Sequence, residues 1–301
     1  MGIPHPIPYQ GSKRKLAEII LRYIPDDTQR LIEPFAGSAA VSIAAAYHHK
    51  AHQFLLNDLN VPLMNLWNRI IHQPNDLAAG YQYLWERQHG QEKDYYAFVR
   101  DEFNRTRRPD YFLYLLARCV KAAVRYNAAG DFNQSADNRR KGSVPDTMRS
   151  HIVRTAELLL GKVALRDTDY REVLETAHSL DVVYLDPPYQ GTSSGADGRY
   201  LAGLAHDEFV DTLKNLNQQG IAYILSYDGH TGTKKYGKSL PISLGLTKLV
   251  LNAGRSSQAT LLGREAITYE SLYLSPSLIA RLDVSSQLYT PLSSLPLVSA
   301  L

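Results

Sequence analysis

The segment Asp186-Pro187-Pro188-Tyr189 comes directly after the apolar run Val182–Leu185, where a buried strand would end. A carboxylate, two rigid prolines and an aromatic ring are suited to gripping a flat base that carries an exocyclic amine. Asp186 can accept one amine hydrogen, and the carbonyl of Pro187 can accept the other, since no ladder partner is expected beside a proline. The ring of Tyr189 can stack on the base. Drawing both hydrogens out of the ring plane would localise the nitrogen lone pair for attack on an electrophilic methyl group.

A second chemical signature lies in Glu33-Pro34-Phe35-Ala36-Gly37-Ser38-Ala39, which leads from a short apolar run into a helical pattern. A strand, a tight glycine turn and a helix start form a nucleotide cradle, because glycine permits close backbone approach and the helix start presents free N–H groups. Asp58 lies 21 residues beyond Gly37, a spacing that suits a carboxylate bound to ribose hydroxyls. Taken alone, Asp58 would more often be a helix cap. The turn lacks the full G-x-G-x-x-G fingerprint, which argues against a nicotinamide enzyme.

These residues need strand ends to position them, and alternating strands and helices predict an α/β fold with a doubly wound, Rossmann-like sheet. The expected strands are Leu31–Glu33, Gln53–Asn57, Val163–Leu165, Val182–Leu185 and Ile221–Ser226. The expected helices are Ala39–Tyr47, Tyr170–Ala177 and Asp207–Gln218. Leu246–Leu251 and Ile267–Leu274 are expected to close the sheet as an antiparallel pair.

A segment of different composition interrupts this alternation of strands and helices. Residues 73–124 are rich in helical patterns, and residues 126–142 are rich in Gly, Asn and Arg. We therefore expect a mainly helical insert in the α/β domain. The expected divisions are a catalytic domain of residues 1–72 and 151–280, an inserted recognition domain of residues 73–150, and a poorly packed C-terminal tail of residues 281–301.

Positive charge is concentrated in the insert. Between Arg105 and Arg149 there are ten Lys or Arg residues against four Asp, although the whole chain has a net charge of only +3. Such a local field suits a polyanion such as nucleic acid. Arg and Asn make bidentate pairs with guanine and adenine in the major groove. The candidate base-reading residues are Arg125, Asn127, Asn133, Arg139 and Arg140, with Tyr126 placed to stack where a base has left its helix.

Composition limits the class of protein. With 301 residues and 44% hydrophobic content, the chain can bury one sizeable core and a smaller insert. The single cysteine, Cys119, is expected to be a small core residue in a helix over Tyr111–Val124. No run reaches the roughly 20 apolar residues of a membrane span, so we expect a soluble, cytoplasmic protein without membrane partners. His48-His49-x-x-His52 lacks the carboxylate of a zinc motif, and no metal site is expected.

In the order of these elements the chain resembles the Dam-like (D12 class) DNA adenine N6-methyltransferases, which use S-adenosylmethionine. The resemblance covers about residues 8–276. Tyr9-Gln10-Gly11-Ser12-Lys13 is similar to the family's N-terminal motif, whose Lys and neighbouring aromatic help to bind the cofactor. Ile32–Gly37 resembles the family's glycine turn, and Asp58 its acidic ribose ligand.

The resemblance also assigns roles to later motifs. Asp167-Thr168-Asp169-Tyr170 is similar to the family's Asp-aromatic pair, which implies that Asp169 takes the adenine amine of the cofactor and Tyr170 flanks its ring. Asp186–Tyr189 resembles the catalytic motif, and Leu225–Asp228 the wall of the target-base pocket. The implied cofactor residues are Tyr9, Lys13, Glu33, Pro34, Phe35, Gly37, Ser38, Asp58, Asp169 and Tyr170.

Two positions depart from the family pattern. Ala39 occupies the place where the family commonly has a second glycine, and its methyl group could tighten the turn. Arg125–Asn133 is similar to the family's R-Y-N-x-x-G-x-F-N hairpin, but Gln134-Ser135-Ala136 replaces the Pro-Phe-Gly expected after it. We expect this hairpin to enter DNA with a base preference of its own. Asn252–Ser257 resembles a loop near the flipped base, so Arg255 and Ser256 are expected to contact phosphates.

The sequence thus predicts a site-specific enzyme that flips an adenine out of duplex DNA and methylates its N6 from S-adenosylmethionine. N4-methylation of cytosine remains open, because the same grip fits any exocyclic amine. Ribosomal RNA as substrate and a catalytically inactive DNA-binding module are further alternatives. The simplest alternative is that Asp186 is an ordinary turn residue in a Pro-rich turn that ends a strand. A separate restriction endonuclease would be a natural partner of such an enzyme.

Overall fold

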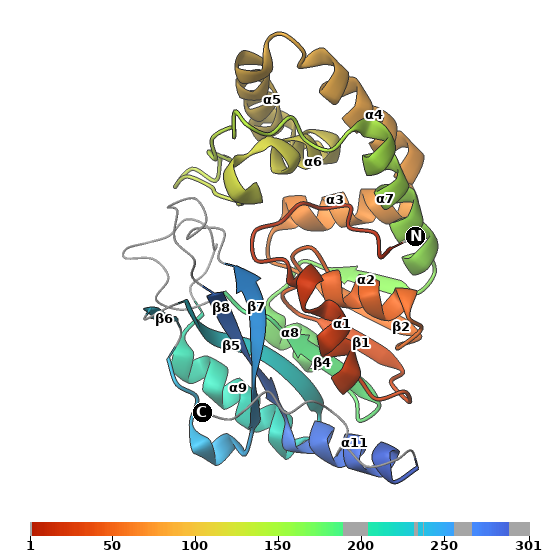
Figure 1. Ribbon diagram of the computed structural model, residues 1–301, viewed down its shortest axis with the longest axis vertical. Helices are drawn as coiled ribbons and strands as arrows, with labels where there is room; N and C mark the ends of the chain where they lie inside the picture. Colours follow the sequence, from red (N-terminus) through yellow and green to blue (C-terminus); the bar gives the residue numbers. More distant parts are fainter. Residues whose placement is uncertain (1, 189–203, 232–233, 237, 256–266, 289–301) are drawn as a thin grey trace.

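The computed structural model describes residues 2–188, 204–231, 234–236, 238–255 and 267–288 (Figure 1). These residues form one mixed sheet in the strand order β3-β2-β1-β4-β5-β8-β7, with β6 paired to β5 at the side. The strands are β1 (Arg30–Glu33), β2 (Gln53–Asn57), β3 (Val163–Arg166), β4 (Asp181–Leu185), β5 (Ala222–Thr231), β6 (Lys234–Tyr236), β7 (Thr247–Arg255) and β8 (Ile267–Leu274). The first five strands in this order are parallel, and β7 and β8 form the antiparallel pair that the sequence predicts.

The two faces of the sheet bury alternate residues of each strand. Val182 and Tyr184 of β4 pack in one hydrophobic cluster, and Val183 and Leu185 pack in another. The first face is covered by α1 (Ala17–Ile20) and α2 (Ala40–Tyr47), and the second by α8 (Tyr170–Leu174) and α9 (His206–Gln218). This is the three-layer arrangement of a doubly wound α/β fold, which confirms the predicted fold class.

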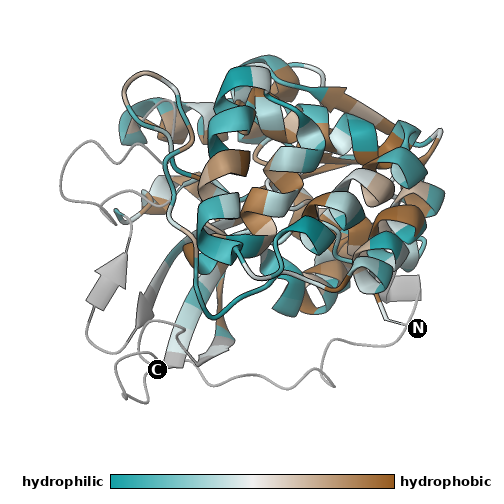
Figure 2. Cartoon of the chain, turned by 90° about the horizontal axis from the view of Figure 1, so that it is seen from above, coloured by the Kyte–Doolittle hydropathy of each residue, from teal (hydrophilic) through white to brown (hydrophobic). Residues whose placement is uncertain are grey.

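The interrupting segment is mainly helical, as expected, and occupies the upper part of the molecule in Figure 1. Its neighbouring helices are α3 (Val61–His72), α4 (Pro74–Arg87), α5 (Glu92–Thr106), α6 (Pro109–Arg118) and α7 (Pro145–Leu159). Apolar side chains from these helices join the cluster that also contains Val182 and Tyr184. Figure 2 shows the brown, hydrophobic stretches lying among the helices. The helical part and one sheet face therefore share a core, and the expected boundary at residue 150 falls inside α7.

Cys119 is fully buried, as expected of a small core residue, but the helix predicted over Tyr111–Val124 is too long. Helix α6 ends at Arg118, because Cys119 takes an extended conformation and bridges Ala136. Lys121 then has a positive φ of 59°, which no α-helix accommodates.

The tail expected from residue 281 begins inside a helix. Helix α11 (Pro276–Leu288) continues through this boundary. Arg281 donates from Nη1 to the carbonyl oxygens of Asp181 and Ser179 and pairs through Nη2 with Asp27. The side chain thus contacts the first residue of β4 and the segment that precedes it. In the part of the chain that the structure describes, no helix has the length and apolar character needed to cross a bilayer.

Arg281→Ala should lower the free energy of unfolding by about 1–3 kcal/mol, because it leaves acceptors at the foot of β4 without their donor. Lys214→Ala, which removes an exposed ion pair with Asp211, is the matched control and should cost about 0–1 kcal/mol. Urea unfolding of both variants measures the difference. Equal losses would show that Arg281 is a surface residue with no anchoring role.

Candidate active site

The chain reverses its direction of winding between β1 and β4. From β1 it moves outward to β2 and β3, whereas from β4 it moves the opposite way to β5. In open α/β sheets, ligands bind outside the carboxyl ends of the strands at such a switch point. The glycine turn follows β1 and Asp186 follows β4, so the two sequence signatures meet at this place in the fold.

The glycine turn is held from three sides. Gly37 has a φ of 49°, its N–H donates to Asp58 Oδ2 at 3.1 Å, and its carbonyl accepts from Trp67 Nε1 at 3.0 Å. A Cβ at Gly37 would lie 3.1 Å from the ring of Tyr9. Only glycine satisfies both the backbone angle and the approach of this ring. The N-terminal motif and the glycine turn are therefore packed together, as their shared assignment to the cofactor implies.

Two further residues shape this turn. Ser38 Oγ donates to Ser12 Oγ at 2.7 Å, which is a second link to the N-terminal motif. Ala39, the departure from the family pattern, precedes α2 with a φ of 45° and a ψ of 38°. This is the left-handed region that favours glycine, so the turn keeps its shape at an energetic cost to alanine.

Asp58 makes the contacts of a cap and lies at the predicted ribose position. Its Oδ1 accepts from Asn60 N at 3.0 Å at the start of α3, while Oδ2 accepts from Gly37 N. Burial raises the pKa of this carboxyl group, and the two backbone hydrogen bonds oppose the rise. Asp58 therefore fixes the glycine turn and is half-buried beside it, and its role as a ribose ligand stays a prediction.

Asn57 is a site residue that we did not identify from the sequence. Its buried amide donates to the carbonyl oxygens of Pro34 at 2.9 Å and Thr168 at 3.0 Å, and its Oδ1 accepts from Thr168 N. One side chain thus joins the ends of β1, β2 and β3. The available signal was a polar residue ending the apolar pattern Phe54–Leu56, where an unpaired amide would be costly.

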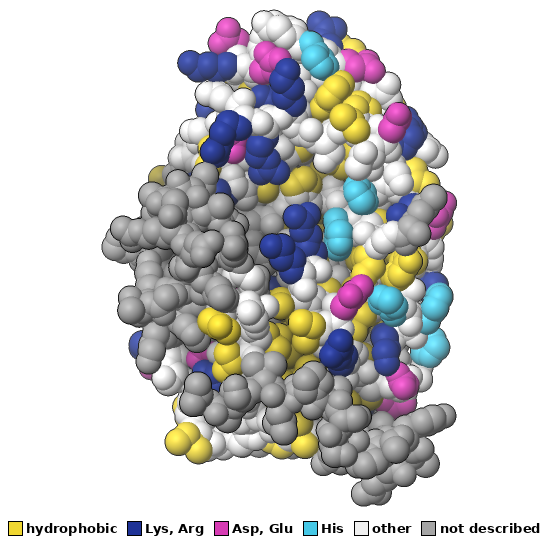
Figure 3. Space-filling view, in the orientation of Figure 1, with side chains coloured by type: hydrophobic (Ala, Val, Ile, Leu, Met, Phe, Trp, Pro, Cys, Tyr) yellow, Lys and Arg dark blue, Asp and Glu magenta, His cyan; other side chains and the backbone are white. Residues whose placement is uncertain are grey.

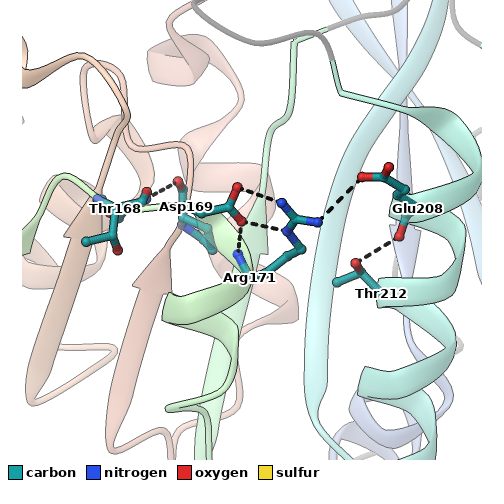
Figure 4. Close-up of polar contacts among 7 residues, drawn as sticks. Thr168, Asp169, Arg171, Glu208 and Thr212 are labelled. Carbon is teal, nitrogen blue, oxygen red and sulfur yellow. Dashed lines mark hydrogen bonds and ion pairs between the residues drawn. The ribbon is translucent and has the colours of Figure 1, made fainter.

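The predicted Asp-aromatic pair lies beside the same turn, and Figure 4 shows its aspartate, Asp169, next to Arg171. The rings of Tyr170 and Phe35 have centroids 5.1 Å apart. Asp169 caps α8 by accepting from Arg171 N, and its carboxylate also binds the Arg171 guanidinium, which lowers its pKa. Arg171 Nη1 lies 3.5 Å from Glu208 Oε2 on α9. Binding the adenine amine would therefore require Asp169 to share its carboxylate with Arg171.

Asp186 meets a buried lysine at the end of β4. Lys13 Nζ lies 3.2 Å from Asp186 Oδ1 and 2.8 Å from Glu270 Oε2, and the Lys13 side chain is only 6% exposed. Burial raises the pKa of Asp186 to about 6, and the Glu270 charge adds to this rise while the Lys13 charge opposes it. In this structure Lys13, expected to bind the cofactor, contacts the candidate catalytic carboxylate.

Glu33 lies on the same face of the sheet, at the end of β1. It is 2% exposed, and its Oε1 accepts from Ser42 N at 2.6 Å in the first turn of α2. Burial raises its pKa to about 8, and the charge of Asp186 contributes to the rise. Pro34 is buried and Phe35 half-buried in the turn that follows. An uncharged Glu33 near neutral pH is the consequence.

The insert hairpin is fixed to α5. Asn104 accepts from Phe132 N at 2.8 Å and donates to its carbonyl oxygen at 3.0 Å, a contact that we did not anticipate from the sequence. Arg125 and Asn133 are exposed on the hairpin, with Asn133 N donating to Arg125 O. Asn127 is exposed too, but its Oδ1 accepts from two backbone N–H groups of the hairpin turn.

Tyr126 does not have the free ring expected of a stacking residue. It is 9% exposed, packs edge-on against Phe132, and donates its hydroxyl hydrogen to Asn60 Oδ1 at 3.0 Å. This ring is part of the packing that joins the hairpin to α3. An intercalating role would require the ring to leave that packing, so we do not propose this role for Tyr126.

The basic stretch beyond the hairpin is partly neutralised from within. Exposed Arg139 pairs with Asp137 at 3.2 Å, whereas Arg140 is half-buried next to it. Lys and Arg side chains gather over the helical part of the face drawn in Figure 3. Tyr189 and Ser256 lie outside the described residues, and only the backbone of Arg255 is described, at the end of β7.

Comparison of the sequence with known protein families identifies the family to which this chain belongs. Residues 9–250 match the model of the D12 class N6 adenine-specific DNA methyltransferases. The chain belongs to this family. The matched residues include the glycine turn, Asp58, the insert and Asp186, which confirms the resemblance seen in the sequence.

Individual relatives agree with this assignment. A DNA N-6-adenine-methyltransferase of Escherichia phage P1 is 31% identical over 60% of this chain and 23% of its own length. The retron Ec67 DNA adenine methylase of Escherichia coli is 31% identical over 62% of this chain and 64% of its own length. A DNA adenine methylase of Serratia marcescens is 29% identical over 68% of this chain and 78% of its own. The match to the first two thus covers less than two thirds of each relative.

Glu33→Gln should change how the stability of this methyltransferase-family chain depends on pH. The amide keeps an oxygen for Ser42 N but cannot ionise. The folded-state pKa of Glu33 is raised from 4.5 to about 8, so its stabilising contribution is complete below pH 4.5 and is lost as the pH rises through 8. Between pH 5 and 8 the wild type should therefore lose stability relative to the variant, by roughly 3–4 kcal/mol.

Urea unfolding without cofactor at several pH values measures this difference. Glu102→Gln, on α5, replaces a half-buried carboxyl group whose pKa is lowered by Arg105; it is the control and should show no such loss. Parallel curves for wild type and Glu33→Gln would contradict the assignment of an uncharged Glu33.

Proposed function

We propose that this protein transfers a methyl group from S-adenosylmethionine to N6 of an adenine in duplex DNA. The observation that carries the proposal is the meeting of Asp186 with the glycine turn at the switch point between β1 and β4. Family membership supports the same activity. A carboxylate at a ligand-binding strand end, followed by Pro187 and Pro188, suits an amine that must be held by both hydrogens.

The turn around Gly37 fits the cofactor. The missing Cβ lets the ring of Tyr9 approach the turn before α2, and we assign Asp58, which binds Gly37 N, to the ribose hydroxyls. Phe35 and Tyr170 offer apolar ring faces for an adenine. When bound, S-adenosylmethionine supplies an electrophilic methyl group on a positively charged sulfonium. A cationic ligand next to Glu33 would favour the ionised form of that carboxyl group.

Asp186 orients the amine of the target base. Its carboxylate accepts one amine hydrogen, and the carbonyl of Pro187 is placed in sequence to accept the other. Both contacts favour a nitrogen lone pair that points away from the ring plane, and the carboxylate stabilises positive charge as it develops on the nitrogen. No general base is required, since the methylated, positively charged amine is acidic enough to lose its proton to solvent.

Duplex DNA would be read by the insert. The amine of a paired adenine is inaccessible, so the base must leave the helix to reach Asp186. Arg125 and Asn133 are the exposed hairpin residues suited to base edges, while Asn127 shapes the turn that presents them. We assign Arg139, Arg140, Arg255 and Ser256 to phosphate contacts. We also propose a cytoplasmic location, where bacterial DNA lies, and a separately acting restriction endonuclease as partner.

Asp186→Ala should abolish methyl transfer while leaving cofactor affinity within a few-fold, because its carboxylate holds the amine and not the cofactor. Loss of such a contact costs about 2.7–4 kcal/mol of transition-state stabilisation, or a hundred- to a thousandfold in rate. Single-turnover transfer of labelled methyl groups to DNA measures the rate, and calorimetry measures the affinity. Turnover near the wild-type value would remove Asp186 from the mechanism.

Asp58→Ala should have the opposite profile. Cofactor affinity should fall by about 1.5–3 kcal/mol, the usual worth of a hydrogen bond to a charged group, and turnover at saturating cofactor should largely survive. The variant should also be less stable, because Gly37 N and Asn60 N lose their acceptor. Asp146→Ala, at the start of α7, is the control for a helix-start acid remote from the turn. Unchanged calorimetric affinity would leave Asp58 as a cap alone.

A further inference from the structure

Glu270 is a charged residue in the middle of a closing strand, and neither the motifs nor the family resemblance singles it out. Its Oε2 lies 2.8 Å from Lys13 Nζ, and that same nitrogen lies 3.2 Å from Asp186 Oδ1. Both carboxylates are 21% exposed and the lysine is 6% exposed. One buried cation is thus shared by two acids that are 84 positions apart in the sequence.

Glu270 and Asp186 lie on the same face of the sheet, because side chains alternate between the two faces along each strand. Leu272 and Leu274 of β8 pack in the same cluster as Val182 and Tyr184 of β4, and Glu270 and Asp186 continue these two alternations. Strand β5 separates β4 from β8 and bulges between Ser226 and Gly229. A Cβ at Gly229 would lie 2.5 Å from the carbonyl oxygen of Tyr269, so the bulge requires glycine there. Strand β8 itself stays regular against β7 at Glu270.

Among the described residues, the titratable groups that interact with Asp186 come from four segments. Lys13 approaches from the N-terminal segment, Glu33 from β1, Tyr184 from β4 and Glu270 from β8. Glu33 and Tyr184 have raised pKa values, chiefly through burial, and are uncharged near neutral pH. Two charges therefore act on the ionisation of Asp186: Lys13 favours its negative form, and Glu270 disfavours it.

A lysine side chain is a flexible stem, so each ion pair that Lys13 makes restricts where Nζ can lie. The carboxylate of Glu270, on strand β8, adds its restraint to the one made by Asp186 after β4. Among the described residues, the contact with Lys13 falls on Oδ1 of Asp186, an arrangement that would leave Oδ2 for a ligand. Sub-ångström placement of this kind matters, because a displacement of about 1 Å can cost a hundredfold in rate.

We propose that Glu270 is a positioning residue for methyl transfer: it holds Lys13 against one oxygen of Asp186 and so presents the other oxygen to the target amine. The role rests on the proposed function, since it concerns the same carboxylate. In this proposal Lys13 orients the catalytic carboxylate in addition to the cofactor-binding role expected from the sequence.

Glu270→Gln and Lys13→Met test the arrangement because their effects on Asp186 have opposite signs. Removing the Glu270 charge should shift the titration of Asp186 to lower pH, and removing the Lys13 charge should shift it to higher pH. Carboxyl ¹³C NMR of the full chain without ligands, with Asp186 assigned through Asp186→Asn, records both shifts independently of activity. Asp211→Asn, an exposed charge change on α9, should leave the titration in place.

The same variants are then assayed for single-turnover methylation across pH. Glu270→Gln should slow methyl transfer about ten- to a hundredfold, move the acid limb of the rate profile to lower pH, and leave calorimetric cofactor affinity within about threefold. Lys13→Met should move the acid limb to higher pH. A residue with only a structural role would lower stability without moving either profile, and unshifted profiles would overturn the proposal.

A wild type that transfers no methyl group while the NMR shifts appear would refute the proposed function instead, and with it any catalytic role of Glu270.

Discussion

The organisation of this molecule depends on the reversal of winding between β1 and β4. Because the chain leaves these neighbouring parallel strands in opposite directions, their carboxyl ends are free of crossing connections. The glycine turn and Asp186 occupy those two ends, and the N-terminal motif packs across both through Tyr9 and Lys13. The proposed nucleotide cradle and the proposed amine-binding carboxylate therefore become neighbours although about 150 residues of chain separate them.

Buried polar side chains keep this crevice in shape. Asn57 joins three strand ends, Trp67 and Asp58 hold Gly37, and Lys13 joins Asp186 to Glu270. Each of these groups would be costly if it lost its partner, so the site is specified by mutual satisfaction of its polar atoms. Among the described residues, Lys13 faces two carboxylates, Asp186 and Glu270, and this balance of charge would suit a positively charged ligand.

Local signals predicted the scaffold well. The end of β2 at Asn57, the end of β4 at Leu185 and the closing pair of β7 and β8 follow from apolar runs bounded by polar or proline residues. The extension of α11 beyond residue 280 was not predicted, because its anchors, Asp181 and Asp27, are distant in sequence. Glu270 escaped notice for the same reason. Its only local sign was an acid in the otherwise apolar alternation of β8.

Nucleoside analysis of methylated DNA tests the central claim most directly. Unmethylated duplex DNA is incubated with the purified protein and S-adenosylmethionine that carries a labelled methyl group, and the digested nucleosides are identified by mass spectrometry. The account predicts label on N6-methyldeoxyadenosine, and no label when Asp186→Ala replaces the wild type. Label on N4-methyldeoxycytidine, or unlabelled DNA from a protein that binds the cofactor, would contradict it.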